Sequence, residues 1–442
     1  VSRFDVTDLH KIFRSPNYHT YMAHVRYATR GSKDMILEEA HPHVIGGTIE
    51  NRDNHIMIWD CDMAAVHNGQ VDTVFLKDSA PEHMYSSCDT EALLYLYRDH
   101  GEYNFLKEVP GAYTMAIADK RKRDVIVMRD RTGIKPGVLG WKDGKYGVAS
   151  EDIAFRKNGG EYVEDLEPGT IYYLTPEGDF SKEVVVETNL AHCFFEWNYI
   201  TDLDSIVNGV SVRRIRESLG EVLSEEFQPG DADFVTYLPR CPEVAARSYA
   251  KKADLPFQPV FYKMRGERSF QGSNADERKE SIGQNLHLLP GMAQKIKGKT
   301  VILLDDSIVR GNNSKRARDL LYEEAGVEKA YLVSYTPPIG IIGDDGVPRG
   351  CTFGVDMPPD PPPGDEFIAR NRTVTEVGQA MKMPVVYLSM EGMLKAFERA
   401  GLPERDLCTF CIGGRMPYEG AESLIQIGEK PQMDLLAGLK AG

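Results

Sequence analysis

The stretch from Lys299 to Ile339 constrains the fold more than any other part of the sequence. Val301 to Leu304 is a short apolar run of the kind that fills a strand buried on both faces, and it stops abruptly at Asp305 and Asp306. A polar turn and an amphipathic helical pattern follow, and Lys329 to Tyr335 indicates a second strand. The order strand, loop, helix, strand predicts a βαβ unit, whose loop lies at the carboxyl end of a parallel sheet, where open α/β folds bind ligands.

That loop has the chemistry of a phosphate site. Backbone N–H groups from Ser307 to Ser314 lead into a helix N-terminus, so they offer oriented donors and a positive dipole end to an anion. Gly311 lets the backbone come close to a ligand. Asp305 and Asp306 are acceptors, which suit sugar hydroxyls or hydrated Mg²⁺ better than phosphate. The simpler alternative is that Asp306 or Ser307 merely caps the helix.

The run from Lys299 to Ser314 resembles the signature of type I phosphoribosyltransferases, which bind 5-phosphoribosyl 1-pyrophosphate. The resemblance implies that the acids hold the ribose diol and Mg²⁺, while the loop clamps the 5′-phosphate. Basic residues after a predicted strand at Pro259 to Lys263 resemble those of a loop that closes over the substrate in the family; a solvated charged loop is the alternative. The implied substrate-binding residues are Asp305, Asp306, Ser307, Ile308, Val309, Arg310, Gly311, Asn312, Asn313, Ser314, Lys263, Arg265 and Arg268.

Composition narrows the partners and the compartment. The chain of 442 residues carries 52 basic and 67 acidic side chains, a net charge of −15, which argues against nucleic acid or an anionic membrane as the main partner. No apolar stretch reaches the roughly 18 residues of a membrane span, and the first residues lack the pattern of a signal peptide. Seven scattered cysteines do not form a disulfide framework. We therefore expect a cytoplasmic protein.

The first 190 residues show a different pattern, with short strands and hairpins around one helix. This predicts an α+β layout, in which Thr90 to Asp99 is the helix and Gly101 ends it. Two cysteines here, Cys61 and Cys88, are predicted to be buried thiols. The expected strands are Tyr21 to Thr29, His55 to Val66, Ala112 to Ala118, Asp124 to Met128 and Thr170 to Leu174, with a hairpin around Asp143-Gly144.

Several motifs of this half resemble, in order and spacing, the glutaminase domain of glutamine phosphoribosylpyrophosphate amidotransferases. They are His24 to Gly31, His67 to Gly69, Asp89 to Glu91, Arg129 to Gly140 and Glu167 to Gly169. The resemblance implies a four-layer αββα domain of the N-terminal-nucleophile fold over residues 1–190, followed by an α/β parallel-sheet phosphoribosyltransferase domain over residues 191–442.

The resemblance also assigns roles to four residues. Arg26 binds the α-carboxylate of glutamine and Asp89 its α-amino group, while Asn68 and the Gly69 N–H form the oxyanion hole. These roles make electrostatic sense, because opposite charges meet and neutral donors face developing charge. Taken singly, each residue has a plainer interpretation. Arg26 could lie on a strand surface, Asn68-Gly69 could form a type I′ turn, and Asp89 could cap a helix.

The family's nucleophile has no counterpart in this sequence. It is a cysteine at the mature N-terminus, whose own α-amine acts as base, and it lies a few dozen residues ahead of the point that matches Val1. As written, the chain is therefore not expected to hydrolyse glutamine. We expect the sequence to lack its N-terminal segment; a genuine loss of glutaminase activity is the alternative.

Four cysteines fall at the positions of cluster ligands in the iron–sulfur branch of the family: Cys193, Cys351, Cys408 and Cys411. Four thiolates suit either Zn²⁺ or a [4Fe–4S] cluster, and the resemblance favours the cluster. Its role would be structural, since it would tie residue 193 to the C-terminal segment.

The resemblance covers nearly the whole chain and predicts an amidophosphoribosyltransferase of purine biosynthesis. Such an enzyme makes 5-phosphoribosylamine, and the resemblance adds purine nucleotides as feedback ligands and a homo-oligomer. Departures from the family pattern at Arg240-Cys241-Pro242 and Asn312-Asn313, with the absent nucleophile, keep open an ammonia-dependent transferase or a non-catalytic regulator that binds phosphoribosyl pyrophosphate or nucleotide.

Overall fold

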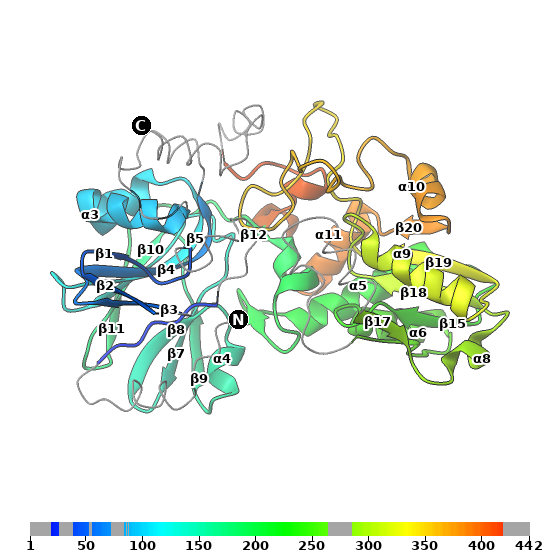
Figure 1. The fold of residues 1–442 in the computed structure, drawn as a ribbon, viewed down its shortest axis with the longest axis horizontal. Coiled ribbons are helices and arrows are strands. Elements are labelled where there is room, and N and C mark those ends of the chain that lie inside the picture. Colours follow the sequence, from blue (N-terminus) through cyan, green and yellow to red (C-terminus); the bar gives the residue numbers. More distant parts are fainter. Residues whose placement is uncertain are drawn as a thin grey trace. The chain divides into compact units, whose positions relative to one another are not determined.

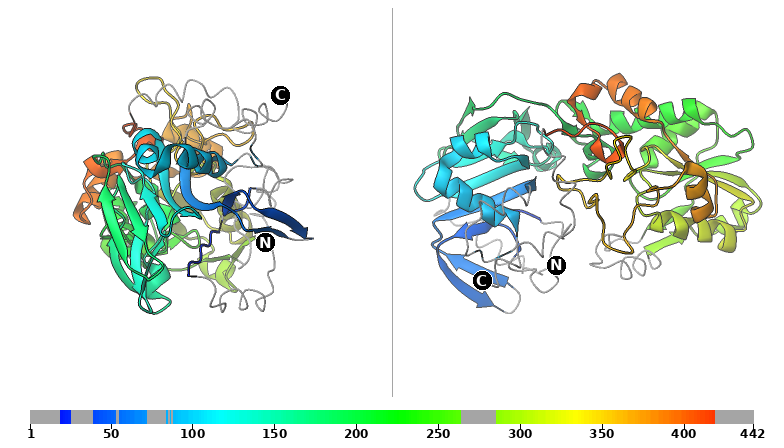
Figure 2. Two further views of the ribbon diagram at one scale, coloured as in Figure 1. Left: turned by 90° about the vertical axis from the view of Figure 1, so that its left-hand side faces the viewer. Right: turned by 90° about the horizontal axis from the view of Figure 1, so that it is seen from above.

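The computed structural model describes residues 19–25, 39–52, 55–71, 84, 86, 88–263 and 285–418. These residues form two compact units, which divide between His192 and Cys193. We refer to them as unit 1 and unit 2 and describe each by itself. Their elements can be followed by colour in Figure 1 and Figure 2.

Unit 1 is built on three sheets. The largest has six antiparallel strands in the order β1-β4-β5-β6-β10-β11. A three-stranded sheet has the order β8-β7-β9, and β2 pairs with β3. The strands are β1 (His43–Ile45), β2 (Thr48–Arg52), β3 (His55–Trp59), β4 (Met63–Val71), β5 (Gly111–Asp119), β6 (Val125–Arg129), β7 (Val138–Lys142), β8 (Lys145–Ala149), β9 (Glu161–Asp165), β10 (Thr170–Leu174) and β11 (Phe180–Val184).

The side chains of β5 point alternately to the two faces of the large sheet, and each face packs against a different layer. On β5, Met115 and Ile117 pack with the apolar face of α3 (Asp89–Glu108), whereas Ala116 packs with Leu139 of the small sheet. α3 therefore covers one face of the large sheet (Figure 1) and the small sheet lies on the other. On the outer side of β7 lies α4 (Ile153–Arg156), whose Phe155 ring occupies the place that a Cβ at Gly140 would need.

Three sequence-based expectations for unit 1 need correction. The strand expected from His55 to Val66 is two strands, β3 and β4, because Asp60 adopts a left-handed conformation between them, with φ of 55°. Tyr21 to Val25 is not a strand, and the rest of that expected element lies outside the described residues. Cys61 is half-buried rather than buried, whereas Cys88 is buried as expected.

The helix of unit 1 is also longer than expected. α3 continues to Glu108, although Gly101 interrupts it with φ of 73° and ψ of 168°. Gly101 thus ends the first helical segment, as the sequence indicates, and a second segment follows the kink.

The Arg129 to Gly140 motif forms a buried hydrogen-bonded frame. The Arg129 side chain is 1% exposed and donates to the carbonyl oxygens of Lys135 (2.9 Å), Gly133 (2.9 Å) and Leu166 (2.6 Å). Its own carbonyl accepts the Gly169 N–H at 3.0 Å. The side chain and the carbonyl of Arg129 together therefore join the loop after β6 to Leu166 and to Gly169 of the Glu167 to Gly169 motif.

We expect Arg129→Met to destabilise unit 1 by about 4 kcal/mol, because three buried carbonyl groups would lose their charged donor. Thermal unfolding of the full chain measures this change. The matched control is Arg98→Met, since Arg98 is an exposed residue that pairs with its neighbour Asp99; its unfolding should shift little. Equal unfolding temperatures for the two variants would contradict the role given to Arg129.

Unit 2 is built on a four-stranded parallel sheet in the order β15-β18-β19-β20. Its strands are β15 (Phe234–Tyr237), β18 (Thr300–Asp305), β19 (Lys329–Ser334) and β20 (Val385–Tyr387). The helices are α5 (Val212–Glu226), α6 (Glu243–Ala253), α8 (Met292–Ile296), α9 (Asn312–Asp319), α10 (Val374–Met381) and α11 (Met390–Arg399). Three pairs of short strands are β12 (His192–Cys193), which begins in unit 1, with β21 (Leu407–Cys408), β13 (Ile206–Val207) with β14 (Val210–Ser211), and β16 (Phe261–Lys263) with β17 (Leu286–Leu288). Two short π-helices are η2 (Glu196–Ile200) and η3 (Leu320–Glu324), and two 3₁₀-helices are η4 (Glu404–Asp406) and η5 (Phe410–Ile412).

The predicted βαβ unit is present. β18 lies between β15 and β19, and its residues Val301 to Leu304 are fully buried, because both faces of the strand are covered. Ala317 of α9 and Leu320 and Leu321 of η3 pack into the same core. The loop between β18 and α9 therefore leaves the sheet at its carboxyl edge, as expected.

The strand predicted at Pro259 to Lys263 is present as β16, which pairs antiparallel with β17 and not with the parallel sheet. The β13-β14 hairpin lies just before α5. Among the described residues no helix has both the length and the hydropathy needed to cross a bilayer.

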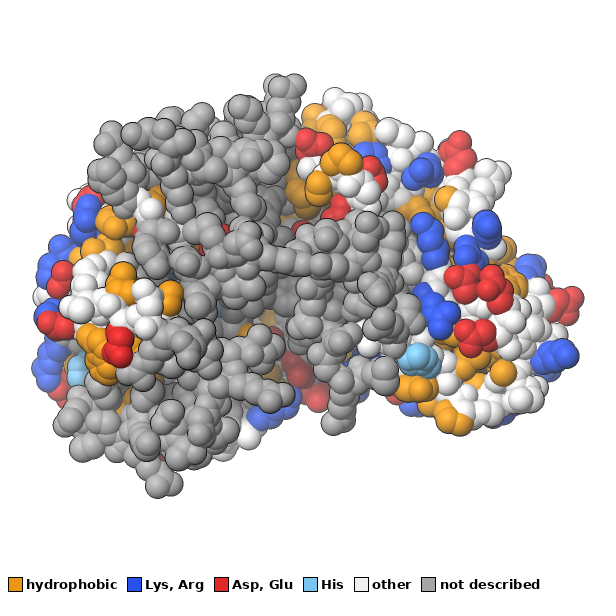
Figure 3. Space-filling view, in the orientation of Figure 1, with side chains coloured by type: hydrophobic (Ala, Val, Ile, Leu, Met, Phe, Trp, Pro, Cys, Tyr) orange, Lys and Arg blue, Asp and Glu red, His pale blue; other side chains and the backbone are white. Residues whose placement is uncertain are grey.

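Acidic and basic side chains alternate on the surface of unit 2. Figure 3 shows them side by side over the region of α9 and η3, where Arg316 pairs with Glu324 at 3.4 Å and Arg318 pairs with Asp319. Such pairs contribute little to stability.

Candidate active sites

Asp305 and Asp306 lie at the end of β18 and are buried, with 7% and 9% of their surface exposed. The Ser314 hydroxyl donates to Asp305 Oδ2 at 2.9 Å, and the Ser307 hydroxyl donates to Asp306 Oδ1 at 2.9 Å. The N-cap of α9 is Gly311. The alternative that Asp306 or Ser307 caps this helix is therefore wrong.

Burying Asp305 and Asp306 side by side costs electrostatic free energy when both are ionised. Burial raises the pKa of Asp306 to about 6, and burial followed by the charge of Asp306 raises the pKa of Asp305 well above its usual value. The charge of Lys263 opposes the rise at both acids, and that of Arg216 opposes the rise at Asp306, but only in part. Burial and the nearby Arg240 in turn lower the pKa of Lys263. A divalent cation or a set of hydroxyl donors at this place would relieve the penalty.

The loop that follows Asp305 and Asp306 has backbone N–H groups that are available to a ligand. Within the part of the chain that the structure describes, the backbone N–H groups of Ser307 to Gly311 donate to no protein acceptor. The loop is held from behind instead. Ile308 is buried in the core, and the Val309 carbonyl accepts the Ile368 N–H at 2.8 Å. An anion could therefore take these donors without displacing a protein hydrogen bond.

Two residues of this loop have structural reasons for their identity. Gly311 adopts φ of 75°, and a Cβ there would lie 2.9 Å from Met381 Sδ. The Arg310 guanidinium is turned toward Asp365, at 3.2 Å, and is 10% exposed. Arg310 can therefore reach an anion through its backbone N–H, whereas its side chain anchors the loop to residues 356–365.

The loop after β15 lies at the same edge of the sheet. The Cys241 thiol donates to the Asn198 carbonyl at 3.1 Å and lies 3.4 Å from the Tyr335 hydroxyl. Burial raises the pKa of Cys241 to about 12. Pro242 precedes α6 as its N-cap residue. Cys241 thus packs inward, and Arg240 brings positive charge beside Lys263.

Sequence reasoning missed Arg216 at this site. Arg216 lies on α5, is 4% exposed, and donates to the carbonyl oxygens of Trp197 (2.7 Å) and Thr201 (2.9 Å). Its charge lowers the pKa of Asp306. The sequence signal that could have identified Arg216 is its position, because it is a charged residue on the apolar face of the amphipathic helix α5.

In unit 1, Asn68 and Gly69 lie within β4, opposite Thr114 and Tyr113 of β5. The alternative of a type I′ turn is therefore wrong. Gly69 has φ of 150°, and a Cβ there would lie 1.9 Å from the Ala112 carbonyl oxygen. The Asn68 amide donates to the Ser150 hydroxyl at 3.4 Å.

Asp89 lies beside these residues at the start of α3. Its Oδ2 accepts the Val71 N–H at 3.1 Å, so it joins the end of β4 to the helix. The N-cap of α3 is Cys88, which makes the capping interpretation of Asp89 wrong. The Asp89 side chain is 14% exposed, and its Oδ1 lies 3.9 Å from His67 Nδ1. Arg26, Arg265 and Arg268 lie outside the described residues.

The Cys411 thiol lies near the other three predicted cluster cysteines in unit 2. None of the seven cysteines forms a disulfide. Burial raises the pKa of Cys411 well above its usual value, and the neighbouring Cys351, Cys193 and Cys408 raise it further. Burial likewise raises the pKa of Cys408 to about 12. Cys193 and Cys411 are buried and the other two are half-buried, so the group offers neighbouring thiols of the kind that bind a metal group as thiolates.

Comparison with known proteins supports the predicted family for both halves of the chain. Residues 60–176 match the family model of a glutamine amidotransferase domain. The amidophosphoribosyltransferase of Methanocaldococcus jannaschii is 30% identical over 94% of this chain and 87% of its own length. That of Bacillus subtilis is 30% identical over 90% of this chain and 80% of its own. The solved glutamine phosphoribosylpyrophosphate amidotransferase of B. subtilis, complexed with ADP and GMP, superposes with a TM-score of 0.71 at 28% identity, covering 90% of this chain and 83% of that one.

Fold and sites together define a glutamine amidotransferase joined to a phosphoribosyltransferase. The chain belongs to the amidophosphoribosyltransferase family. This confirms the predicted family, the enzyme class of a pentosyltransferase, and the predicted fold of an N-terminal-nucleophile domain followed by a type I phosphoribosyltransferase domain.

The raised pKa of Asp306 predicts a pH-dependent stability. Its pKa is about 6 in the folded protein and about 4 in an unfolded chain. The folded state therefore binds this proton more tightly, so stability falls as the pH rises from about 4 through about 6. In metal-free buffer at pH 7, Asp306→Asn should be more stable than the wild type by about 2 kcal/mol, and the difference should vanish near pH 4.

Urea unfolding at several pH values measures this difference. Asp319→Asn is the control, because Asp319 is partly exposed and paired with Arg318 on α9. A difference for Asp306→Asn that is independent of pH, or a loss of stability at pH 7, would show that the acid pair is not under the inferred penalty.

Proposed function

We propose that this chain transfers the amide nitrogen of glutamine to C1 of 5-phosphoribosyl 1-pyrophosphate. The products are glutamate, pyrophosphate and 5-phosphoribosylamine, the first step of purine biosynthesis. One observation carries the proposal: a buried acid pair ends β18 and is followed by a loop whose backbone N–H groups have no acceptor among the described residues.

In the proposed transferase site, the N–H groups of Ser307 to Ser314 bind the 5′-phosphate. Asp305 and Asp306 accept hydrogen bonds from the ribose hydroxyls and steady the positive charge that builds at C1 as its bond to pyrophosphate loosens. Their buried carboxylate oxygens are donors of the kind that Mg²⁺ takes. Mg²⁺, when bound, neutralises charge on the pyrophosphate.

The same site must hold both reactants in line. Ammonia forms a bond to C1 from the face opposite pyrophosphate, the C1–O bond breaks, and the new amine loses a proton. Lys263, with Arg265 and Arg268, neutralises the leaving pyrophosphate. Since no covalent intermediate with the protein is needed, positioning and electrostatics supply the rate enhancement.

In the proposed glutaminase site, Arg26 binds the α-carboxylate of glutamine and Asp89 its α-amino group. The Asn68 amide and the Gly69 N–H stabilise the oxyanion. The absence of space for a side chain at Gly69 supports the use of its backbone N–H. In the family, the nucleophile is a cysteine ahead of the position that matches Val1.

Three finer proposals concern regulation and assembly. The B. subtilis relative was solved with ADP and GMP, so we propose purine nucleotides as feedback ligands of this chain. We also propose a cytoplasmic homo-oligomer. The nucleotide proposal can be tested separately from catalysis, by nucleotide binding to an Asp305→Asn variant.

A [4Fe–4S] cluster is the proposed group for Cys193, Cys351, Cys408 and Cys411. The nearness of the other three cysteines to the Cys411 thiol supports it. The cluster would join β12 and β21, which already pair with each other, to the segment around Cys351. It would be structural, so no catalytic step depends on it.

Asp305→Asn should lower the rate of pyrophosphate release with ammonium by about 100-fold, because one of the two acids that steady charge at C1 is lost. Asp319→Asn is the control on the same βαβ unit and should retain full activity. Any glutaminase activity of the complete protein should be unchanged in both variants.

The same assay separates the competing functions. Turnover with both glutamine and ammonium supports the complete enzyme. Turnover with ammonium alone indicates a transferase with an inactive glutaminase. If neither substrate releases pyrophosphate from the wild type, the proposed function is wrong and the chain is a non-catalytic binder.

Cys411→Ser should remove the iron, because Cys411 is the thiol whose pKa all three of the other cysteines raise. After anaerobic purification we expect about four iron atoms per wild-type chain and less than one in the variant. Cys61→Ser, which changes a half-buried thiol of unit 1, should keep its iron. Zinc instead of iron in the wild type would refute the cluster.

A further inference from the structure

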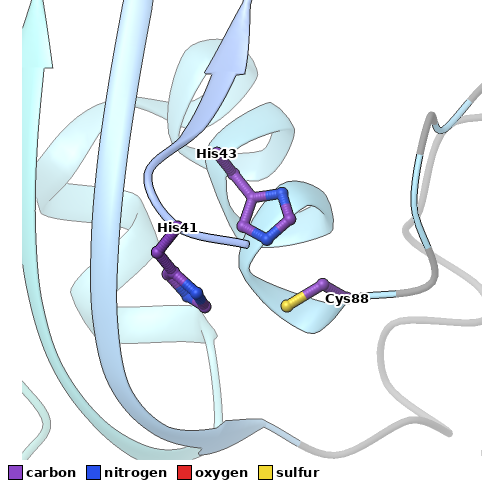
Figure 4. A group of neighbouring side chains, drawn as sticks. All are labelled: His41, His43 and Cys88. Carbon is purple, nitrogen blue, oxygen red and sulfur yellow. The ribbon is translucent and has the colours of Figure 1, made fainter. Parts of the chain in front are cut away.

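Two histidines and a cysteine converge in unit 1, and none of them is one of the four predicted cluster cysteines. One nitrogen of His41, one nitrogen of His43 and the sulfur of Cys88 all lie within 4.8 Å of one another. Figure 4 shows the three side chains directed toward a common point. They come from separate places in the sequence, since the histidines lie at the start of β1 and the cysteine lies at the start of α3.

From this arrangement we propose a binding site for a divalent transition metal of the Zn²⁺ class, with His41, His43 and Cys88 as three protein ligands. Imidazole nitrogen and thiolate sulfur are the donors that Zn²⁺ prefers, at roughly 2.0 to 2.3 Å. Donors bound to one tetrahedral ion lie about 3.5 Å apart. Side-chain rotations of a small amount would bring the observed group to that spacing.

The surroundings of His41 support the metal site. His41 Nε2 is hydrogen-bonded to the Thr90 hydroxyl at 2.9 Å, which leaves Nδ1 as the nitrogen that can face a metal. A ligand histidine commonly has its other nitrogen held in this way, because the partner fixes the orientation of the ring. The His24 ring stacks on His41 at 4.2 Å, and His43 meets it edge-on at 4.8 Å.

The position of Cys88 supports a thiolate ligand. Cys88 is the N-cap residue of α3 and is buried. The thiol donates to Asp89 Oδ1 or the Thr90 hydroxyl, each at 3.6 Å, and on metal binding it would lose this proton and exchange those contacts for the metal. The N-terminus of a helix favours the negative charge that results. His43 is also buried, with 5% of its surface exposed, so two of the three donors are shielded from bulk water.

The proposed site has a structural consequence. A metal held by these donors would tie the start of β1 to the start of α3, next to Asp89. The site does not depend on the transferase chemistry of unit 2, nor on the cluster cysteines.

Metal analysis of the full chain tests the proposal. After anaerobic purification from zinc-supplemented medium, the wild type should hold about one zinc per chain. His43→Ala and Cys88→Ala should each lose at least nine-tenths of it and keep their iron. Cys61→Ala, the matched control in the same unit, should keep its zinc. The proposal is overturned if the wild type binds no zinc, or if zinc stays in both ligand variants and leaves with Cys411→Ser.

A second measurement covers the case in which a ligand variant fails to fold. Co²⁺ added to zinc-depleted wild type should give tetrahedral d–d bands and a thiolate-to-cobalt charge-transfer band. Thr90→Val should weaken Zn²⁺ affinity by about 10-fold or more, and Thr90→Ser should restore it. Absence of the charge-transfer band in folded wild type would also overturn the proposal, as would equal affinities for Thr90→Val and Thr90→Ser.

Discussion

Two carboxylates buried side by side at the end of one strand are the constraint on which unit 2 depends. Asp305 and Asp306 follow a strand whose four preceding apolar residues are fully covered, so the chain cannot move them into water without opening the sheet. Ser314 and Ser307 hold one oxygen of each. Lys263, Arg216 and Arg240 are gathered nearby as a consequence. Burying these two carboxylates lowers the stability of the folded protein, and it leaves two acceptors placed for a cationic or hydroxyl-bearing ligand.

Backbone and side chains divide the recognition between them. In the proposed phosphate loop the available donors are main-chain N–H groups, while the side chains of Ile308 and Arg310 attach the loop to the protein behind it. The loop can therefore accept asparagine at positions 312 and 313 in place of other polar residues. What the fold requires there is the backbone of the first turn of α9, and asparagine can form that turn as other polar residues can.

Much of this could be predicted from the sequence, for identifiable reasons. The apolar run Val301 to Leu304 and the acids after it are local signals, so β18 and its loop follow directly. In unit 1 the strands at 111–119, 125–129 and 170–174 also have clear patterns. The residues that could not be predicted depend on long-range packing. Arg216 becomes part of the acid site only because α5 crosses near β18, and His41 meets Cys88 only because β1 lies beside α3. The break at Asp60 depends on a single left-handed residue, which leaves no periodic signal.

Packing alone keeps glycine at position 69, independently of the oxyanion role proposed for it. The carbonyl of Ala112 leaves no room for any side chain there, whether or not glutamine is bound. A relative that had lost glutamine hydrolysis would still need this glycine, whereas Asn68, whose amide makes a long 3.4 Å contact with Ser150, could change. Under the proposed roles, the asparagine and not the glycine would therefore indicate which relatives still hydrolyse glutamine.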